Sequence, residues 1–153
     1  MQKTIELSGK EMKFKSSAAT NILYKKAFGE DILVKLTAYS KNVKELKNMQ
    51  AKIAELRADQ SRPQEEILEE MNKVMNSEVF TSSQTFSSET LPRLAYIMWL
   101  EANEKQQDIL RKLNEDEYIV WIMGIDQDDL LAITGDVMEL WQAGAKTHSK
   151  PKN

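Results

Sequence analysis

The sequence of 153 residues contains no cysteine, one histidine, three prolines and five glycines. Without cysteine the chain cannot form a disulfide, a thiolate zinc site, an iron–sulfur cluster or a cysteine nucleophile. Scarce glycine and proline argue against a β-sandwich, which needs many turns, and favour helices. No apolar run approaches the roughly 20 residues of a membrane span, and no signal-peptide core is present. We therefore expect a cytoplasmic protein without a membrane segment.

The same scarcities remove most routes to catalysis. The single histidine, His148, lies near the C-terminal end, where we expect neither an orienting partner nor a rigid site. Its absence from the body of the chain excludes Ser-His triads and multi-histidine metal sites. All five glycines are isolated, so no phosphate-binding loop occurs. We expect no enzymatic activity, no cofactor and no metal.

Acidic residues are clustered, but without the spacing of a catalytic or metal site. The run Asp126-Gln127-Asp128-Asp129 resembles the start of a calcium loop, yet Leu131 and Val137 stand where such a loop needs glycine and glutamate. We interpret the run as a helix N-terminus. Glu65 and Glu69 are interpreted as solvated side chains on one helix face. The net charge of −3 does not favour nucleic acid as a partner.

The N-terminal residues predict a β-hairpin over about residues 3–15. Apolar and polar residues alternate on both sides of Gly9, with Ile5 before it and Met12 and Phe14 after it. An isolated hairpin is marginal in water. Its apolar face must therefore pack on helices or pair with another chain.

The chain from about residue 17 to residue 143 predicts a helical body. The longest helix, from Ile32 to Arg57, carries a single apolar stripe. The stripe consists of Val43, Leu46, Met49, Ile53 and Leu56. Because it covers only about two heptads, packing within the chain is favoured over a coiled coil, which stays an alternative. A second helix is predicted over residues 64–76, and the most apolar stretch, 91–103, is the predicted central core helix.

Three later segments complete the predicted organisation. Residues 81–88 are polar and hydroxyl-rich, which predicts a loop. Residues 118–123 have the β-branched content of a strand, but acidic residues before them and a glycine after them favour a short buried helix. A last helix opens at Asp126, and residues 144–153 predict a disordered basic tail. The predicted fold is mainly α, a multi-helix bundle with a small N-terminal β-hairpin, as a single domain over residues 1–143.

Aromatic side chains are the strongest candidates for binding another protein, although they are equally common in cores. Trp99 and Trp121 lie on strongly apolar helices, which favours the core. Trp141 lies at the end of the last helix, which favours a partner contact. The predicted partner-binding residues are Trp141, Leu140, Val137, Phe14 and Met12.

Several segments follow one another in an informative order. The hairpin KTIELSGKEMKFK precedes SAATNILYKKAFGEDIL, then LPRLAYIMWLEAN, then EDEYIVWIMGID and a helix ending VMELWQAG. The segments that most resemble those of a known family are residues 24–33, residues 94–99 and the pair Leu140-Trp141. Over most of the chain this order resembles the tail assembly chaperones of long-tailed, siphovirus-type phages and prophages of Gram-positive bacteria.

The resemblance implies a non-catalytic role in tail morphogenesis in the bacterial host cytoplasm. Such proteins are thought to coat the tape measure protein, keep it soluble and recruit tail tube subunits, and they are generally absent from the mature virion. The resemblance also implies self-association and a longer form of the chain made by ribosomal frameshifting. The alternative is a structural head–tail connector or adaptor protein of the particle. Neither nucleic acid nor a membrane is an expected partner.

Overall fold

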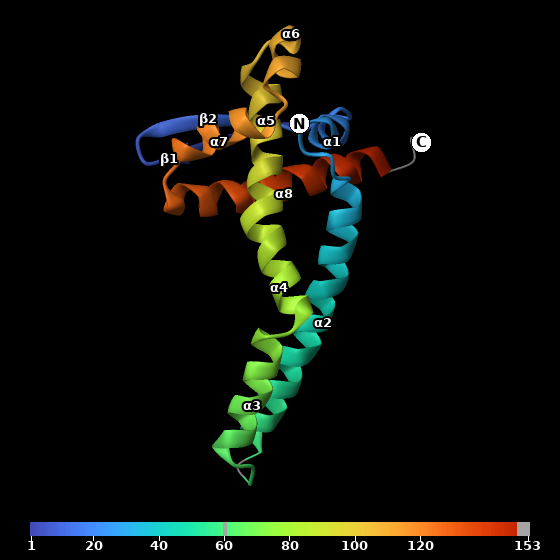
Figure 1. Ribbon diagram of the computed structural model, residues 1–153, viewed down its shortest axis with the longest axis vertical. Helices are drawn as coiled ribbons and strands as arrows, with labels where there is room; N and C mark the ends of the chain where they lie inside the picture. The colour runs from blue at the N-terminus through green and yellow to red at the C-terminus, as the bar shows by residue number, and fades with distance from the viewer. Residues whose placement is uncertain (60, 150–153) are drawn as a thin grey trace. The chain divides into compact units, whose positions relative to one another are not determined.

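The computed structural model describes residues 1–59 and 61–149, with side chains as far as Gly144. The elements in chain order are β1 (Gln2–Leu7), β2 (Lys10–Lys15), α1 (Thr20–Phe28), α2 (Ile32–Ala58), α3 (Gln64–Met75), α4 (Glu78–Thr85), the π-helical turn η1 (Phe86–Thr90), α5 (Leu91–Asn103), α6 (Gln106–Ile109), the 3-10 turn η2 (Leu110–Lys112), α7 (Glu115–Met123) and α8 (Gln127–Ser149). The chain is mainly α-helical with an N-terminal β-hairpin, which confirms the predicted fold class (Figure 1).

The chain divides into two compact units, where the sequence predicted a single domain. Unit 1 comprises Met1–Ile32 and Glu89–Asn153, and unit 2 comprises Leu33–Ser88. The division has a simple physical origin. The helices of unit 2 contain few buried residues, whereas the elements of unit 1 share one apolar core.

The hairpin has the register that its alternation predicts. Ile5 pairs with Met12, and Lys3 pairs with Phe14, so these side chains share one face. Ile5 and Phe14 are buried. The turn contains Gly9 with φ of +78°, a left-handed conformation that glycine adopts without strain. Because β2 contacts α5 and β1 contacts α8, the apolar face of the hairpin docks within its own chain.

Helix α5 is the centre of unit 1. Eight of its 13 residues are buried, and β2, α1, α7 and α8 all contact it. Two of its polar groups fix the surrounding elements. The Tyr96 Oη donates a hydrogen bond of 2.7 Å to the Lys112 carbonyl oxygen, which ties η2 to α5. The Glu101 carboxylate accepts hydrogen bonds from the hydroxyls of Ser17 and Thr20 at the start of α1.

Aromatic rings join α1, α5 and α7. The ring centroid of Tyr96 lies 5.7 Å from that of Tyr118 and 5.5 Å from that of Trp121. The Phe28 ring meets Tyr118 edge-on at 5.5 Å, a geometry that the ring quadrupoles favour. The Arg93 guanidinium lies 5.2 Å from the Phe28 centroid as a cation–π contact. Burial raises the pKa of Tyr96 to about 12, so its phenol stays neutral at physiological pH.

Helix α7 confirms the helical interpretation of the segment that carried strand-like residues. The Asn114 Oδ1 accepts a hydrogen bond of 2.9 Å from the Glu117 amide and so caps the helix. Three acidic residues occupy the first turn, where the helix dipole favours them, and Gly124 follows the last residue. These end signals outweigh the β propensity of the short run between them.

The predicted loop at residues 81–88 is helical instead, within α4 and the start of η1. The Ser77 side chain accepts a hydrogen bond from the Phe80 amide at the start of α4. The hydroxyls of Thr81 and Thr85 each donate to the carbonyl oxygen four residues earlier. The hydroxyl groups that suggested a loop therefore form hydrogen bonds with backbone carbonyl oxygens of the helical segment itself.

The predicted basic tail begins inside a helix. Helix α8 starts one residue after Asp126, as expected, but its backbone continues to Ser149. Gly144, at the predicted start of the tail, is buried beside the Ser16 hydroxyl. Packing of Gly144 against Ser16 continues α8 past the predicted start of the tail. The remaining tail positions, 150–153, lie outside the described residues.

We predict that Tyr96→Phe lowers the free energy of unfolding by about 1 kcal/mol, because it leaves the Lys112 carbonyl oxygen without its partner. Tyr118→Phe is the matched control. Its hydroxyl belongs to the same aromatic cluster but makes no hydrogen bond with the residues that the structure describes. Urea unfolding followed by tryptophan fluorescence measures both changes. Equal losses in the two variants would contradict the prediction.

Candidate protein-binding surfaces

Four of the five predicted partner-binding residues are buried in unit 1. Trp141 is only 4% exposed, and its Nε1 donates a hydrogen bond of 3.0 Å to Asn21 Oδ1. The other buried residues are Leu140, Val137 and Phe14. Met12 is half-buried on β2. Side chains with no accessible surface cannot touch a partner unless their surroundings open, so the structure favours a core role for these four. The position of Trp141 near the chain end misled the prediction because α8 stays packed beyond it.

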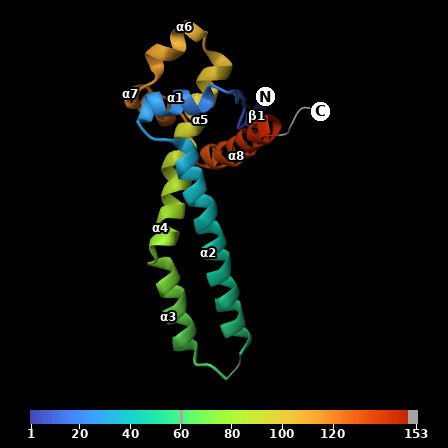
Figure 2. The same ribbon diagram turned by 90° about the vertical axis from the view of Figure 1, so that its right-hand side faces the viewer.

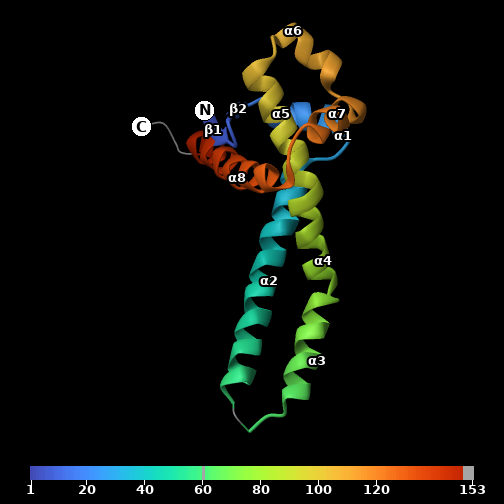
Figure 3. The same cartoon turned by 90° about the vertical axis from the view of Figure 1, so that its left-hand side faces the viewer.

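Unit 2 has a different character, because its helices bury little. Figures 2 and 3 show α2 running beside α3 and α4 in the opposite direction. Ile32, at the boundary with unit 1, is the only buried residue of α2, and α3 has none. Among the described residues of Leu33–Ser88, which exclude position 60, only Ser83 and Phe86 are buried. Two helices side by side cannot enclose an apolar core, and the apolar surface of this pair remains in part accessible.

The apolar stripe of α2 and three apolar residues of the neighbouring α3 are half-buried. We call this surface the α2–α3 seam. It consists of Val43, Leu46, Met49, Ile53 and Leu56 from α2, with Ile67, Met71 and Val74 from α3, all half-buried. Next to the seam, Leu68 and Met75 are 57% and 58% exposed. Packing within the chain therefore covers part of the stripe, as expected, but leaves some of its apolar surface accessible to water.

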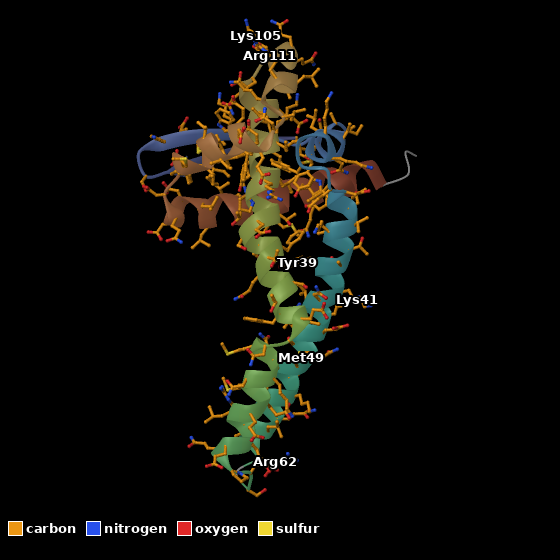
Figure 4. The ribbon with its side chains drawn as sticks, viewed as in Figure 1. Tyr39, Lys41, Met49, Arg62, Lys105 and Arg111 are labelled. Atoms are coloured by element: carbon orange, nitrogen blue, oxygen red, sulfur yellow. The ribbon has the colours of Figure 1, made fainter. Side chains whose placement is uncertain are left out.

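Contacts between side chains hold the helices of unit 2 at both ends. At one end the Tyr39 ring stacks on Phe86 with centroids 4.2 Å apart. At the other end an Arg57 Nη2 lies 3.1 Å from the Met71 sulfur, beside a hollow of about 530 Å³. Figure 4 shows Tyr39 and Met49 along α2, and Arg62 at the connection between α2 and α3. The seam lies between these two ends.

The connection between α2 and α3 is fixed by a polar network. Asp59 accepts hydrogen bonds from the Ser61 hydroxyl at 2.5 Å and the Ser61 amide at 3.1 Å. These bonds hold the pKa of the Asp59 carboxyl below its ordinary value. Arg62 lies 3.6 Å from Asp59 and 3.7 Å from Glu66. Such exposed ion pairs add little stability, but the network defines where α3 begins.

The two helices of the seam carry opposite charge. Helix α2 has six basic residues against two acidic ones, and α3 has four acidic residues against one basic residue. Opposite charge favours pairing of α2 with α3. The seam therefore joins one helix with an excess of basic residues to one with an excess of acidic residues. An amphipathic helix with charges of both signs beside its apolar face matches such a pair of helices.

A smaller apolar patch lies on α7 in unit 1. Ile119, Val120 and Met123 are all exposed there, next to the three acidic residues of the first turn. The other side of the same helix carries Tyr118 and Trp121 against α5. The patch is much shorter than the seam, because α7 spans only Glu115–Met123.

Other kinds of site find no support in the part of the chain that the structure describes. Within it, no group of three or more acidic or histidine side chains is placed to hold a metal ion. No described helix combines the length and the apolar character that crossing a bilayer requires. The His148 side chain lies outside the described side chains.

The chain matches no known protein family, no curated protein and no solved structure. Its function must therefore be argued from the surfaces that the fold exposes.

The stripe of α2 is evident in the sequence, but its spacing alone does not mark it as a binding site. Periodicity shows which face of a helix is apolar, but not how many other helices are available to cover that face. One sign of incomplete cover was present in the sequence, because only one further amphipathic helix is predicted between the stripe and residues 81–88. This sign was weak, because residues 81–88 were themselves predicted to be a loop.

We predict that backbone amides of α2 and α3 exchange hydrogen with solvent faster than those of α5. Few apolar contacts hold the seam closed, whereas α5 is enclosed by other elements. Hydrogen–deuterium exchange with peptide-level mass spectrometry measures this difference, and α8 (Gln127–Ser149) is a second protected reference. Protection of α2 and α3 equal to that of α5 would show that the seam is closed in solution.

Proposed function

We propose that this protein is a non-catalytic binder of a long apolar helical segment, and that its biological role is tail assembly chaperone of a siphovirus-type phage or prophage. In this role it binds the tape measure protein, keeps it soluble in the host cytoplasm and recruits tail tube subunits. The observation that carries the proposal is the α2–α3 seam, whose apolar side chains along two amphipathic helices are only half-buried. The order of sequence features described above supports the same role.

The geometry of the seam suits a helical partner. A third amphipathic helix placed along α2 and α3 would complete a small bundle and remove the accessible apolar surface from water. Each square ångström so buried contributes about 25 cal/mol. Much of that gain is offset by the loss of translational and side-chain freedom on association. A single contact is therefore expected to be weak.

A tape measure protein offers many such contacts along one rod. Copies bound side by side on one rod gain avidity if they also contact one another, so that weak contacts to the rod still give high occupancy. A bare apolar rod would aggregate, and covering its exposed surface with half-open helix pairs prevents that. The mixed charges beside the seam remain in water and keep the covered rod soluble.

We predict that co-expression with the neighbouring tape measure protein increases the soluble fraction of that protein several-fold. A variant with Leu46→Glu and Ile53→Glu should lose this effect, because it places two carboxylates in the seam. The matched control, Asn48→Glu with Ala51→Glu, adds the same charge to exposed positions of the same helix and should retain it. Ultracentrifugation of the lysate followed by immunoblotting measures the soluble fraction.

The outcome separates the proposal from its alternatives. If the unmodified protein gives no increase in solubility, or if the seam variant and the control behave alike, binding through the seam is refuted. A head–tail connector would remain in finished particles, whereas an assembly chaperone should be depleted from them. Quantitative mass spectrometry of purified particles decides between these two roles.

A further inference from the structure

A pocket in unit 1 combines aromatic walls with acidic side chains. Its volume is about 440 Å³, and it lies between the hairpin turn, α5 and the connection from α7 to α8. The rings of Trp99 and Trp121, with centroids 6.1 Å apart, form its apolar part. Both rings are half-exposed. Glu11, Asp126 and Asp129 line the same pocket.

The acidic charge of the pocket is not neutralised within the described chain. Three carboxylates line it against one ammonium group, that of Lys10. The side chains of Glu11 and Asp126 make no ion pair or hydrogen bond with the described residues. Asp129 accepts one long hydrogen bond of 3.3 Å from the Ser8 hydroxyl. The pocket therefore keeps an excess of negative charge that can interact with an incoming cation.

Indole rings and carboxylates together select a cationic side chain. The face of a tryptophan ring attracts an ammonium or guanidinium group within about 6 Å. This attraction is stronger for tryptophan than for tyrosine or phenylalanine. A nearby carboxylate adds a charge-assisted hydrogen bond to the same group. The volume falls within the range of pockets that bind a small ligand, which suits one long side chain and its neighbours but not a whole helix.

The chain itself contains a segment of matching chemistry. Residues 146–152, KTHSKPK, include Lys146, Lys150 and Lys152. The segment begins within the last residues of α8, at the opposite end of this helix from Asp129 of the pocket, which lies in its first turn. The 20 residues from Asp129 to Ser149 rise about 1.5 Å each, or roughly 30 Å. The three residues from Ser149 to Lys152 span at most about 11 Å, so neither Lys150 nor Lys152 can return to the pocket of its own chain.

We propose that the pocket binds the lysine-rich segment 146–152 of a second copy of this chain. The two contacting surfaces differ, so the contact is heterologous and links copies head to tail. Every copy in such a row except the last offers its segment to the next copy. The contact depends on charge and is partly solvated, so added salt weakens it.

This inference deepens the proposed function by naming how copies associate, and it rests on that function only for its biological purpose. The seam and the pocket lie in different units and use different residues. Tests of the pocket require no tape measure protein. The failure of one proposal can therefore be told from the failure of the other.

The first test is a peptide titration of the full chain. A synthetic peptide KTHSKPK should shift the indole N–H resonances of Trp99 and Trp121 in heteronuclear NMR spectra. The Trp141 indole, which is buried and bonded to Asn21, should stay in place as an internal control. The peptide QTHSQPQ, without the three ammonium groups, should cause no shift. Equal shifts with both peptides, or none at Trp99 and Trp121, would overturn the proposal.

The second test measures self-association of the full chain by sedimentation velocity at low and high ionic strength. Asp126→Asn with Asp129→Asn should weaken association roughly tenfold, which corresponds to about 1.4 kcal/mol. The control, Asp116→Asn with Asp128→Asn, removes equal charge from exposed positions outside the pocket lining and should have little effect. Equal weakening by both pairs, or association that neither pair changes, would refute the head-to-tail contact.

Discussion

The apolar helix α5 is stable only if other elements cover nearly its whole circumference, because it carries too few polar residues to face water on any side. The rest of unit 1 meets this requirement. The hairpin covers it through Phe14, α8 through Val137, and α7 through the rings of Tyr118 and Trp121. The two-stranded hairpin would be marginal alone, and it persists because α5 and α8 supply the apolar surface on which it docks. Even the polar groups of α5 serve this arrangement, since Glu101 orders the start of α1.

Unit 2 lacks an element equivalent to α5. Its long helix α2 has an ordinary amphipathic pattern, and α3 pairs with it, but no third helix within Leu33–Ser88 covers the seam between them. Helices of this kind obtain most of their stability from tertiary packing. The Tyr39–Phe86 stack and the Arg57–Met71 contact join the helices of this unit at its two ends. Half-covered apolar surface is unfavourable in an isolated molecule. Its presence is easier to understand if a partner supplies the missing layer.

Periodicity and end signals predicted the elements well, because both are local. The hairpin, the bounds of α5 and the glycine end of α7 could all be read from residues close in sequence. The burial of Trp141 could not, because it depends on Asn21 and on packing across more than 100 residues of chain. The helical state of residues 81–88 was missed for a related reason. Threonine and serine hydroxyls bond equally well in loops and in helices, so their presence alone does not separate the two.

The separation of the seam from the pocket matters for how weak contacts could act together. A lysine side chain against the two indole rings contributes at most a few kcal/mol, too little to hold two free copies together at low concentration. If many copies bind one rod, as proposed, neighbours on the rod would meet at a high effective concentration, and this balance would change. The segment 146–152 of one copy would then reach the pocket of the next without the full entropic cost of association. Occupation of the rod and contact between copies would each favour the other, as linkage between two binding events requires. Cooperative coverage of the rod would thus arise from the seam and the pocket together, although neither surface needs high affinity for its partner alone.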